Sequence, residues 1–189
     1  MDPGSSNPLC PQCGLCCNGV IFADVQLQRG DDADRLRSLG LTLVQRNQRS
    51  ARAGSAAGTG AVGLKFVQPC ALLDGCLCRA YAQRPKYCRE FDCRLLLEVK
   101  AGRVDQRAAL KTVRQARELA GRVLGLLREL GDAREQLPLG ERFRRIKRRL
   151  ESNPPDAETA RIFGRLTLAV HDLNVLLGES FYSAKGVGS

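Results

Sequence analysis

The spacing of apolar residues differs between the two halves of the chain, and the second half has the period of helices. Over residues 104–130 apolar side chains recur every three or four positions, which predicts a long amphipathic helix. A shorter basic helix is predicted over residues 142–150, before the helix-ending sequence Asn153-Pro154-Pro155. Asp156 is suited to N-cap a last helix that ends near Leu177. The three apolar faces together predict a small helical bundle.

The first half has only short segments with alternating or locally apolar character. Residues 20–22, 25–27, 39–44 and 64–67 predict brief strands, and residues 31–38 predict a short helix with acidic residues at its start. Asp74-Gly75 predicts a tight hairpin, and Pro85 predicts the first turn of another helix. Residues 45–63 are rich in Arg, Ala, Gly and Ser without periodicity, which predicts a flexible loop.

These segments together predict an α+β fold in two parts. After a disordered lead over residues 1–9, we expect a small cysteine-rich metal-binding domain with short strands over residues 10–94. Residues 95–189 then form a helical region that packs on that domain. No run of apolar residues is long enough for a transmembrane helix, and the N-terminus has no apolar signal segment. We therefore expect a cytoplasmic protein that does not enter a membrane.

The nine cysteines lie in two stretches, and none follows Cys93. The first stretch is Cys10-x2-Cys13-Gly14-x-Cys16-Cys17, and the second extends from Cys70 to Cys93. Clustered thiols in a cytosolic protein favour metal or redox chemistry over structural disulfides. The arrangement predicts one or two metal centres that both stretches build jointly. Because Cys16 and Cys17 are adjacent, their side chains tend to diverge, and they would serve more naturally on different sites or different sides of one cluster.

A single histidine restricts the chemistry further. His171 lies within the last predicted helix, far in sequence from the cysteines, where a structural or half-exposed role is typical. Zinc sites of mixed cysteine and histidine ligation are thus excluded, as are nucleophile pairs of Cys or Ser with His. Any site must use thiolates, with Asp74, Glu90 and Asp92 as the nearby carboxylates in sequence.

The chain carries a formal net charge of +10, spread over both halves. The sequence RFRRIKRR, residues 142–149, holds six basic residues in eight. It could follow a phosphate backbone, or it could be a solvated helix face that Phe143 and Ile146 anchor to the bundle. Because no aromatic residues are interleaved to stack on bases, we favour the solvated face, and nucleic-acid binding is not the favoured function.

Both cysteine stretches resemble the YkgJ-type CxxCxxCC family, described as a zinc- or iron-chelating domain. The resemblance rests on the first stretch, on Pro69-Cys70, and on Cys78-x2-Tyr81-x2-Arg84-Pro85-x2-Cys88-Arg89-x-Phe91-x-Cys93. It covers roughly residues 10–94. The resemblance implies a metal centre and assigns its ligands to Cys10, Cys13, Cys16, Cys17, Cys70, Cys78, Cys88 and Cys93. Cys76 falls outside the pattern.

Eight thiolates fit two four-cysteine zinc sites, one 4Fe–4S cluster with spare thiols, or two clusters. The compressed C-x2-C-x2-C run with a remote cysteine favours iron–sulfur over zinc. Five basic residues around the second stretch would offset thiolate charge, namely Arg79, Arg84, Lys86, Arg89 and Arg94. The favoured function is a cytosolic iron–sulfur protein with a redox or accessory role. The alternatives are a zinc module whose basic helices contact a protein or nucleic acid, and a metal-dependent protein-modifying enzyme.

Overall fold

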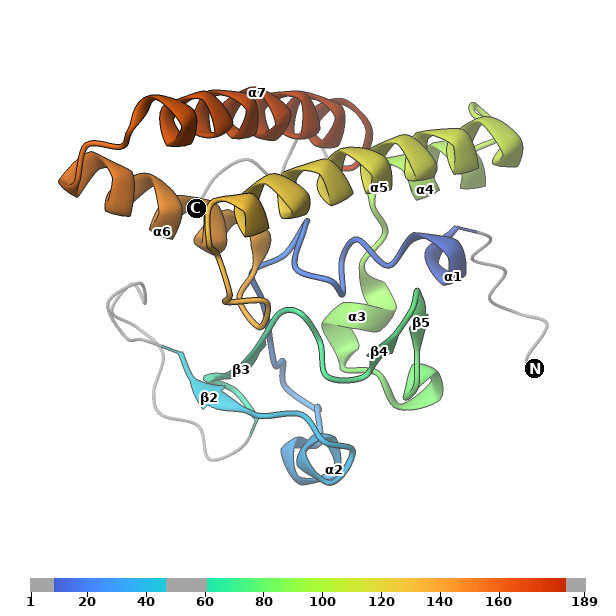
Figure 1. The fold of residues 1–189 in the computed structure, drawn as a ribbon. Helices are drawn as coiled ribbons and strands as arrows, with labels where there is room; N and C mark the ends of the chain where they lie inside the picture. The colour runs from blue at the N-terminus through green and yellow to red at the C-terminus, as the bar shows by residue number, and fades with distance from the viewer. Residues whose placement is uncertain (1–8, 47–60, 183–189) are drawn as a thin grey trace, which may run out of the picture.

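The protein is an α+β fold in which a layer of helices lies against a smaller part that bears the cysteines (Figure 1). A computed structural model describes residues 9–46 and 61–182. Three long helices form most of the layer: α5 (Gln106–Glu129), α6 (Leu139–Ser152) and α7 (Ala157–Ser180). The short α4 (Arg94–Lys100) precedes them. None of the helices in the described residues combines the length and the apolar character needed to cross a bilayer.

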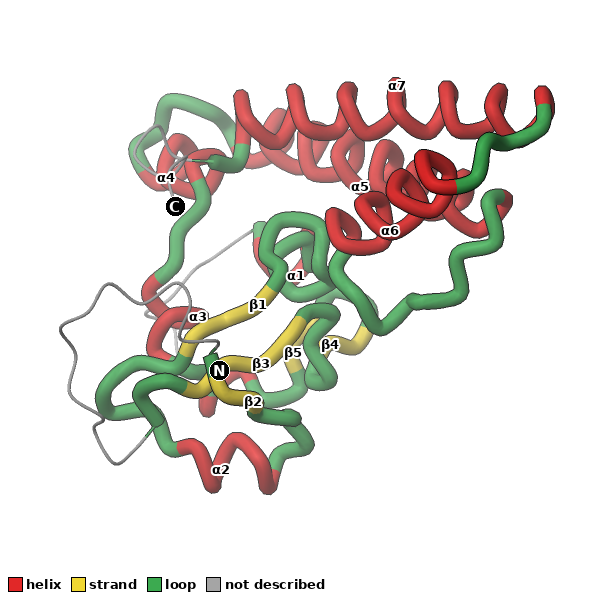
Figure 2. The backbone as a smooth tube through the Cα atoms, turned by 90° about the vertical axis from the view of Figure 1, so that its left-hand side faces the viewer, coloured by secondary structure: helices red, strands yellow, loops and turns green. Residues whose placement is uncertain are grey.

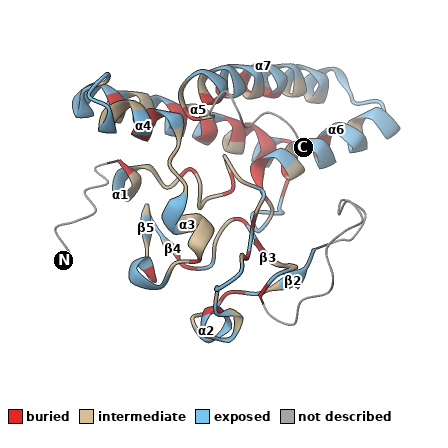
Figure 3. Ribbon diagram, turned by 180° about the vertical axis from the view of Figure 1, so that it is seen from behind, coloured by how far each residue is buried: buried red, intermediate tan, exposed pale blue. Residues whose placement is uncertain are grey.

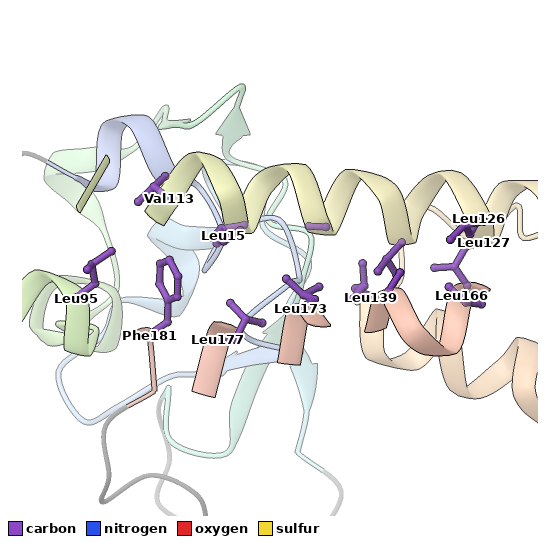
Figure 4. Close-up of a cluster of buried hydrophobic side chains, with 14 of the residues drawn as sticks. Leu15, Leu95, Val113, Leu126, Leu127, Leu139, Leu166, Leu173, Leu177 and Phe181 are labelled. Atoms are coloured by element: carbon purple, nitrogen blue, oxygen red, sulfur yellow. The ribbon is translucent and has the colours of Figure 1, made fainter. Parts of the chain in front are cut away.

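The helices α5 and α7 begin and pack as their sequences predict. Each has an aspartate N-cap, because the Asp105 carboxylate accepts from the amide of Ala108 and the Asp156 carboxylate accepts from that of Thr159. Their inner faces form the main core, which Figure 4 shows as a row of side chains between the two helices. Figure 3 shows the buried residues along the side of α5 that faces the rest of the protein. A residue of the first cysteine stretch, Leu15, is fully buried in this core.

Helix α6 is anchored by apolar residues, as predicted, but one of its arginines is not solvated. The ring of Phe143 stacks on Phe163 of α7 with centroids 6.3 Å apart, and Ile146 is buried. Arg142 is also buried, and its Nε donates to Asp132 at 2.5 Å. The interpretation of the whole basic run as an exposed face is therefore wrong at Arg142, whose charge is neutralised inside the fold.

The smaller part contains two short sheets. Strand β3 (Leu64–Val67) lies between β1 (Asp24–Gln26) and β2 (Val44–Gln45), and both pairings are antiparallel. A hairpin joins β4 (Leu73–Asp74) to β5 (Leu77–Cys78), with Gly75 at φ 58° in its turn. Helix α2 (Ala33–Ser38) lies at the outer end of the sheet, as Figure 2 shows. Among the described residues, a second core of eight buried residues lies in this smaller part, and it includes Phe66 of the central strand β3.

Three short helical segments carry or flank the cysteines. They are α1 (Cys10–Cys13), the 3-10 turn η2 (Tyr81–Gln83) and α3 (Lys86–Glu90). Pro85 is the N-cap of α3, close to its predicted place in the first turn. Helix α3 ends at Glu90, so Cys93 lies beyond it as the N-cap of α4.

Two of the predicted strands are wrong. Residues 20–22 form bends instead of a strand, and Val20 and Ile21 pack on the helical core. Of residues 39–44 only Val44 is in a strand. The flexible loop predicted over residues 45–63 lies mostly outside the described residues, as does most of the disordered lead predicted over residues 1–9.

Candidate metal centre

The two cysteine stretches lie side by side in the fold. The backbone amide of Cys70 donates to the carbonyl oxygen of Cys17 at 2.8 Å, which joins the end of the first stretch to the start of the second. Gly14 also lies against the second stretch, because a Cβ placed on it would come within 3.3 Å of the Cys76 Cα. Its φ of 69° ends helix α1 in the left-handed region, which favours glycine. The two stretches expected to build a joint site are therefore neighbours in the fold.

Cys10, Cys13, Cys16 and Cys93 form what we call the first thiol set. Burial, together with the charge of Cys93 and Cys10, raises the pKa of Cys13 to about 12. Burial raises the pKa of Cys16 well above its ordinary value, and the charges of Cys13 and Cys93 contribute. Burial and then Cys10 raise the pKa of Cys93, against the lowering effect of backbone amides. Each of these four thiols is therefore close enough to others of the set to oppose their ionisation.

Cys17, Cys70, Cys78 and Cys88 form the second thiol set. Burial, followed by the charge of Cys70 and Cys78, raises the pKa of Cys17 to about 12. Burial, followed by the charge of Cys17 and Cys70, raises the pKa of Cys88 to about 12 as well. Burial also raises the pKa of Cys70, and Cys78 adds to this effect. Both sets thus take cysteines from both stretches of the sequence.

The two sets rest on different cores. Cys10, Cys13 and Cys93 of the first set pack against the helical core. Cys70, Cys78 and Cys88 of the second set pack against the core of the small sheet. The peptide that joins Cys16 to Cys17 therefore connects the two sets, one residue contributing to each.

Cys88 and Cys93 also belong to different sets, and the end of helix α3 lies between them. Cys88 lies within α3, whereas Cys93 follows the helix and caps α4. The sequence allowed these two thiols to share a site if the helix ended between them. The helix does end there, yet the electrostatic neighbours of Cys88 are Cys17, Cys70 and Cys78, and those of Cys93 include Cys10.

A cavity of about 120 Å³ borders both thiol sets. Seven cysteines line it, together with apolar and aromatic side chains such as Phe22, Tyr87 and Phe91. The Phe22 ring meets the other two edge to face, with centroids 5.7 and 4.8 Å away. Gln68 lines the same cavity at 2% exposure, and its Oε1 has no hydrogen-bond partner. The cavity is thus lined by sulfur, by aliphatic and aromatic carbon, and by the polar side chains of Gln68 and Arg84.

Arginine charges lie close to the second thiol set, as the sequence predicts. Although burial dominates and raises the pKa of Cys17 and Cys88, the positive charge of Arg84 lowers both. The Arg84 guanidinium is held 3.6 Å from the centroid of the Tyr81 ring. Arg79 lowers the pKa of Cys70 in the same direction, again against the larger effect of burial. These charges partly offset the negative charge that a thiolate site accumulates.

The carboxylates considered from sequence are engaged elsewhere or exposed. Asp92 accepts from Lys100 Nζ at 2.5 Å, and Glu90 lies 4.0 Å from Lys86. Asp74 is exposed in the hairpin. His171 is exposed in the middle of α7. The thiols are therefore the main donors that the fold gathers, and Asp92 lies near Cys93, whose pKa its charge raises after the larger effects of burial and Cys10.

The side chains of the described residues do not converge on a single ion as they stand. No three Cys, His, Asp or Glu side chains in this part of the chain lie close enough together to hold one metal ion. Binding of an ion therefore requires cysteine side chains to turn toward one another. The donor type fits zinc or iron, since four thiolates are the common ligands of structural zinc and of iron–sulfur clusters.

Cys76, which the family pattern leaves out, lies beside the first thiol set. Its charge is among the neighbours that raise the pKa of Cys13, after burial and the larger effects of Cys93 and Cys10. Its sulfur accepts a hydrogen bond of 2.6 Å from Arg117 Nη1 on α5. The same nitrogen donates to the carbonyl oxygen of Gln12 at 3.0 Å. Sequence reasoning missed Arg117, because nothing local links the middle of α5 to the cysteines.

The comparison with family models decides what kind of domain this is. Residues 9–112, more than half of the chain, match the CxxCxxCC model, entitled "Putative zinc- or iron-chelating domain". The chain belongs to the CxxCxxCC family. The family assigns zinc or iron chelation to the part of the chain that contains both thiol sets, and it does not say which metal is bound. The match also includes α4 and the start of α5, beyond the segment expected from the cysteines alone. No curated protein and no solved structure matches the chain.

Proposed function

We propose that this CxxCxxCC protein is a cytoplasmic iron–sulfur protein with two thiolate-bound metal centres and a redox or accessory role. The observation that supports it most is the proximity of eight thiols from both stretches, which we divide into two sets of four. In the first set, Cys10, Cys13 and Cys16 supply a C-x2-C-x2-C run and Cys93 supplies the remote fourth thiol. That spacing is typical of 4Fe–4S ligation, so we assign a 4Fe–4S cluster to this set.

Burial supports a resident cation at both sets. Thiols whose pKa values are raised to about 12, as at Cys13, Cys17 and Cys88, are neutral at physiological pH without metal. A bound cation reverses this preference, because it stabilises the thiolate directly and screens the repulsion between neighbouring sulfurs. A 4Fe–4S cluster in this place would supply one-electron redox chemistry, which the surrounding residues can tune through burial and charge.

Backbone amides that lie near thiols of both sets fit a redox role. Backbone amides of Leu95 and Leu96 lower the pKa of Cys93, in opposition to the larger effect of its burial. Backbone amides of Leu72 and Leu73 do the same for Cys70. Such amide donors stabilise the negative charge on ligating sulfur and raise the reduction potential of a cluster.

The test is metal and sulfide analysis of protein purified without oxygen, with ultraviolet–visible and Mössbauer spectra of the same sample. We expect a brown protein that contains iron and acid-labile sulfide, whose broad visible absorption is bleached by dithionite. Reversible bleaching supports a redox role, and an irreducible cluster supports an accessory one. A colourless protein that contains zinc and no sulfide would contradict the proposal.

Zinc at both sets is the second candidate, and the second thiol set favours it. Cys17, Cys70, Cys78 and Cys88 come from a turn, a loop, strand β5 and helix α3, and they have no compressed cysteine run. Four scattered thiolates on a small core are typical of structural zinc. The same metal analysis separates the candidates, because a zinc module would carry up to two zinc ions and remain colourless in oxygen.

A further inference from the structure

A second cavity, far from the cysteines, lies where the loop before α6 meets the last turns of that helix. Its volume is about 680 Å³, within the range of small-ligand pockets. It shares no lining residue with the cysteine cavity. In Figure 1 helix α6 lies at the end of the helical layer away from α4. This cavity is therefore a separate feature of the protein.

Arginines dominate its lining. Arg134 comes from the loop, and Arg145, Arg148 and Arg149 come from α6. None of the ion pairs within the described ranges includes any of these four side chains. Asp132 is the one acidic lining residue, and its carboxylate is already paired with the buried Arg142. The lining therefore carries a large excess of positive charge without an internal counter-ion.

Acidic residues close in sequence to the cavity are also engaged elsewhere. Glu135 pairs with Arg128 at 2.8 Å, and Glu151 lies 3.7 Å from Lys147. Arg149 is held in place, because its Nη2 donates to the carbonyl oxygen of Leu130. A fixed guanidinium loses less side-chain entropy on binding an anion than a free one does.

We infer that this cavity binds a small ligand that carries two or more phosphate groups. Arginine forks bind phosphate oxygens in pairs, and four of them converge here from two elements of the fold. One phosphate ion would fill a small part of the volume. The lining contains no aromatic side chain on which a base could stack, so recognition must rely on the phosphates themselves. We therefore expect a polyphosphate ligand in preference to single-stranded nucleic acid.

Calorimetric titration of the metal-loaded, full-length protein with inorganic tripolyphosphate tests the inference. We expect saturable binding of one tripolyphosphate per chain. The variant Arg145→Gln/Arg148→Gln should weaken binding by about tenfold or more for each arginine, because each removes a charge-assisted contact. The matched control is Arg114→Gln/Arg122→Gln on α5, which removes the same charge from exposed positions outside the cavity and should bind as the wild type does.

Two further measurements separate the alternatives. A short single-stranded RNA should bind more weakly than tripolyphosphate, and tighter RNA binding that is independent of Arg145 and Arg148 would overturn the inference. Absence of saturable tripolyphosphate binding would overturn it as well. So would equal weakening in both double variants, because that result indicates a diffuse positive field instead of a site. Circular dichroism of each variant verifies that the helices are intact.

Discussion

The amide of Cys70 donates to the carbonyl oxygen of Cys17 at 2.8 Å, although more than fifty residues of chain separate them. This hydrogen bond lies beside the second thiol set, to which both residues contribute. It joins the two cysteine stretches through the backbone. A bound metal would add side-chain links between the same two stretches.

Cys76 and Cys78 provide a first prediction, because they are two residues apart and have different surroundings. Cys78 is a neighbour of Cys17, Cys70 and Cys88, whereas Cys76 is held by Arg117 beside the first set. We expect Cys78→Ser to lose much of its bound metal and Cys76→Ser to keep nearly all of it. The measurement is elemental analysis of the two proteins purified in parallel. Equal losses would show that Cys76 is also a ligand.

A second prediction concerns the pH dependence of the metal-free protein. Burial raises the pKa of Cys13, Cys17 and Cys88 from 9.0 to about 12. These thiols stay neutral in the folded protein while they ionise near pH 9.0 in the unfolded chain. Their stabilising effect is thus fully present below pH 9.0 and is lost as the pH rises toward about 12.

We therefore expect the Tm of the reduced, metal-free protein to fall as the pH is raised above 9.0. Scanning calorimetry of oxygen-free samples at a series of pH values measures this Tm. The control is the variant in which all three cysteines are replaced by serine, which retains the tyrosine, lysine and arginine titrations. Parallel curves for the two proteins would show that the thiols do not cause the fall.

The buried ion pair between Arg142 and Asp132 gives a third prediction. Their side chains are 5% and 3% exposed, so removal of either partner leaves an uncompensated charge in the core. We expect Arg142→Ala to lower the free energy of unfolding by about 3–5 kcal/mol. The exposed Arg144→Ala on the same helix should change it by about 0.5 kcal/mol or less. Urea unfolding of both variants measures these two free energies. Similar small decreases in both variants would mean that water reaches the Asp132 carboxylate.

Metal removal gives a fourth prediction, because the two cores differ greatly in size. The helical core contains nineteen buried residues, and the sheet core contains eight. Without metal bonds, a core this small does not offset an ordering entropy of about 1–2 kcal/mol per residue. After chelation under reducing conditions, we expect amide protection to fall in residues 61–93 while α5 and α7 remain protected. Hydrogen exchange followed by mass spectrometry measures this, and protection retained in both parts would show that the metal is not needed for the fold.

The long helices could be predicted from sequence because their signals are local. In α5 and α7 the apolar period and the aspartate caps lie within the helix that they specify. Helix α4 was missed because its apolar run, residues 95–99, is too short to show a period. Residues 20–22 look like a strand, but Val20 and Ile21 pack on the helical core as bends, and only tertiary contacts determine this.

The proximity of the two cysteine stretches could also be predicted, but the proposed division of their thiols into two sets could not. The sequence pattern identifies eight cysteines and leaves out Cys76. We assign the adjacent residues Cys16 and Cys17 to different sets, because neighbouring side chains in a chain diverge. The burial of Arg142 was hidden for a similar reason, since its partner Asp132 lies ten residues earlier in a loop.

The central claim, two separate four-thiolate centres, is tested most directly by native mass spectrometry of oxygen-free protein, which reports the whole metal and sulfide complement of one chain. Cys93→Ser removes a thiol of the first set, and Cys88→Ser removes a thiol of the second. The account predicts two centres in the wild type, and in each variant the loss of one centre with the other kept intact. Loss of the entire complement in either variant, or a single centre in the wild type, would contradict it.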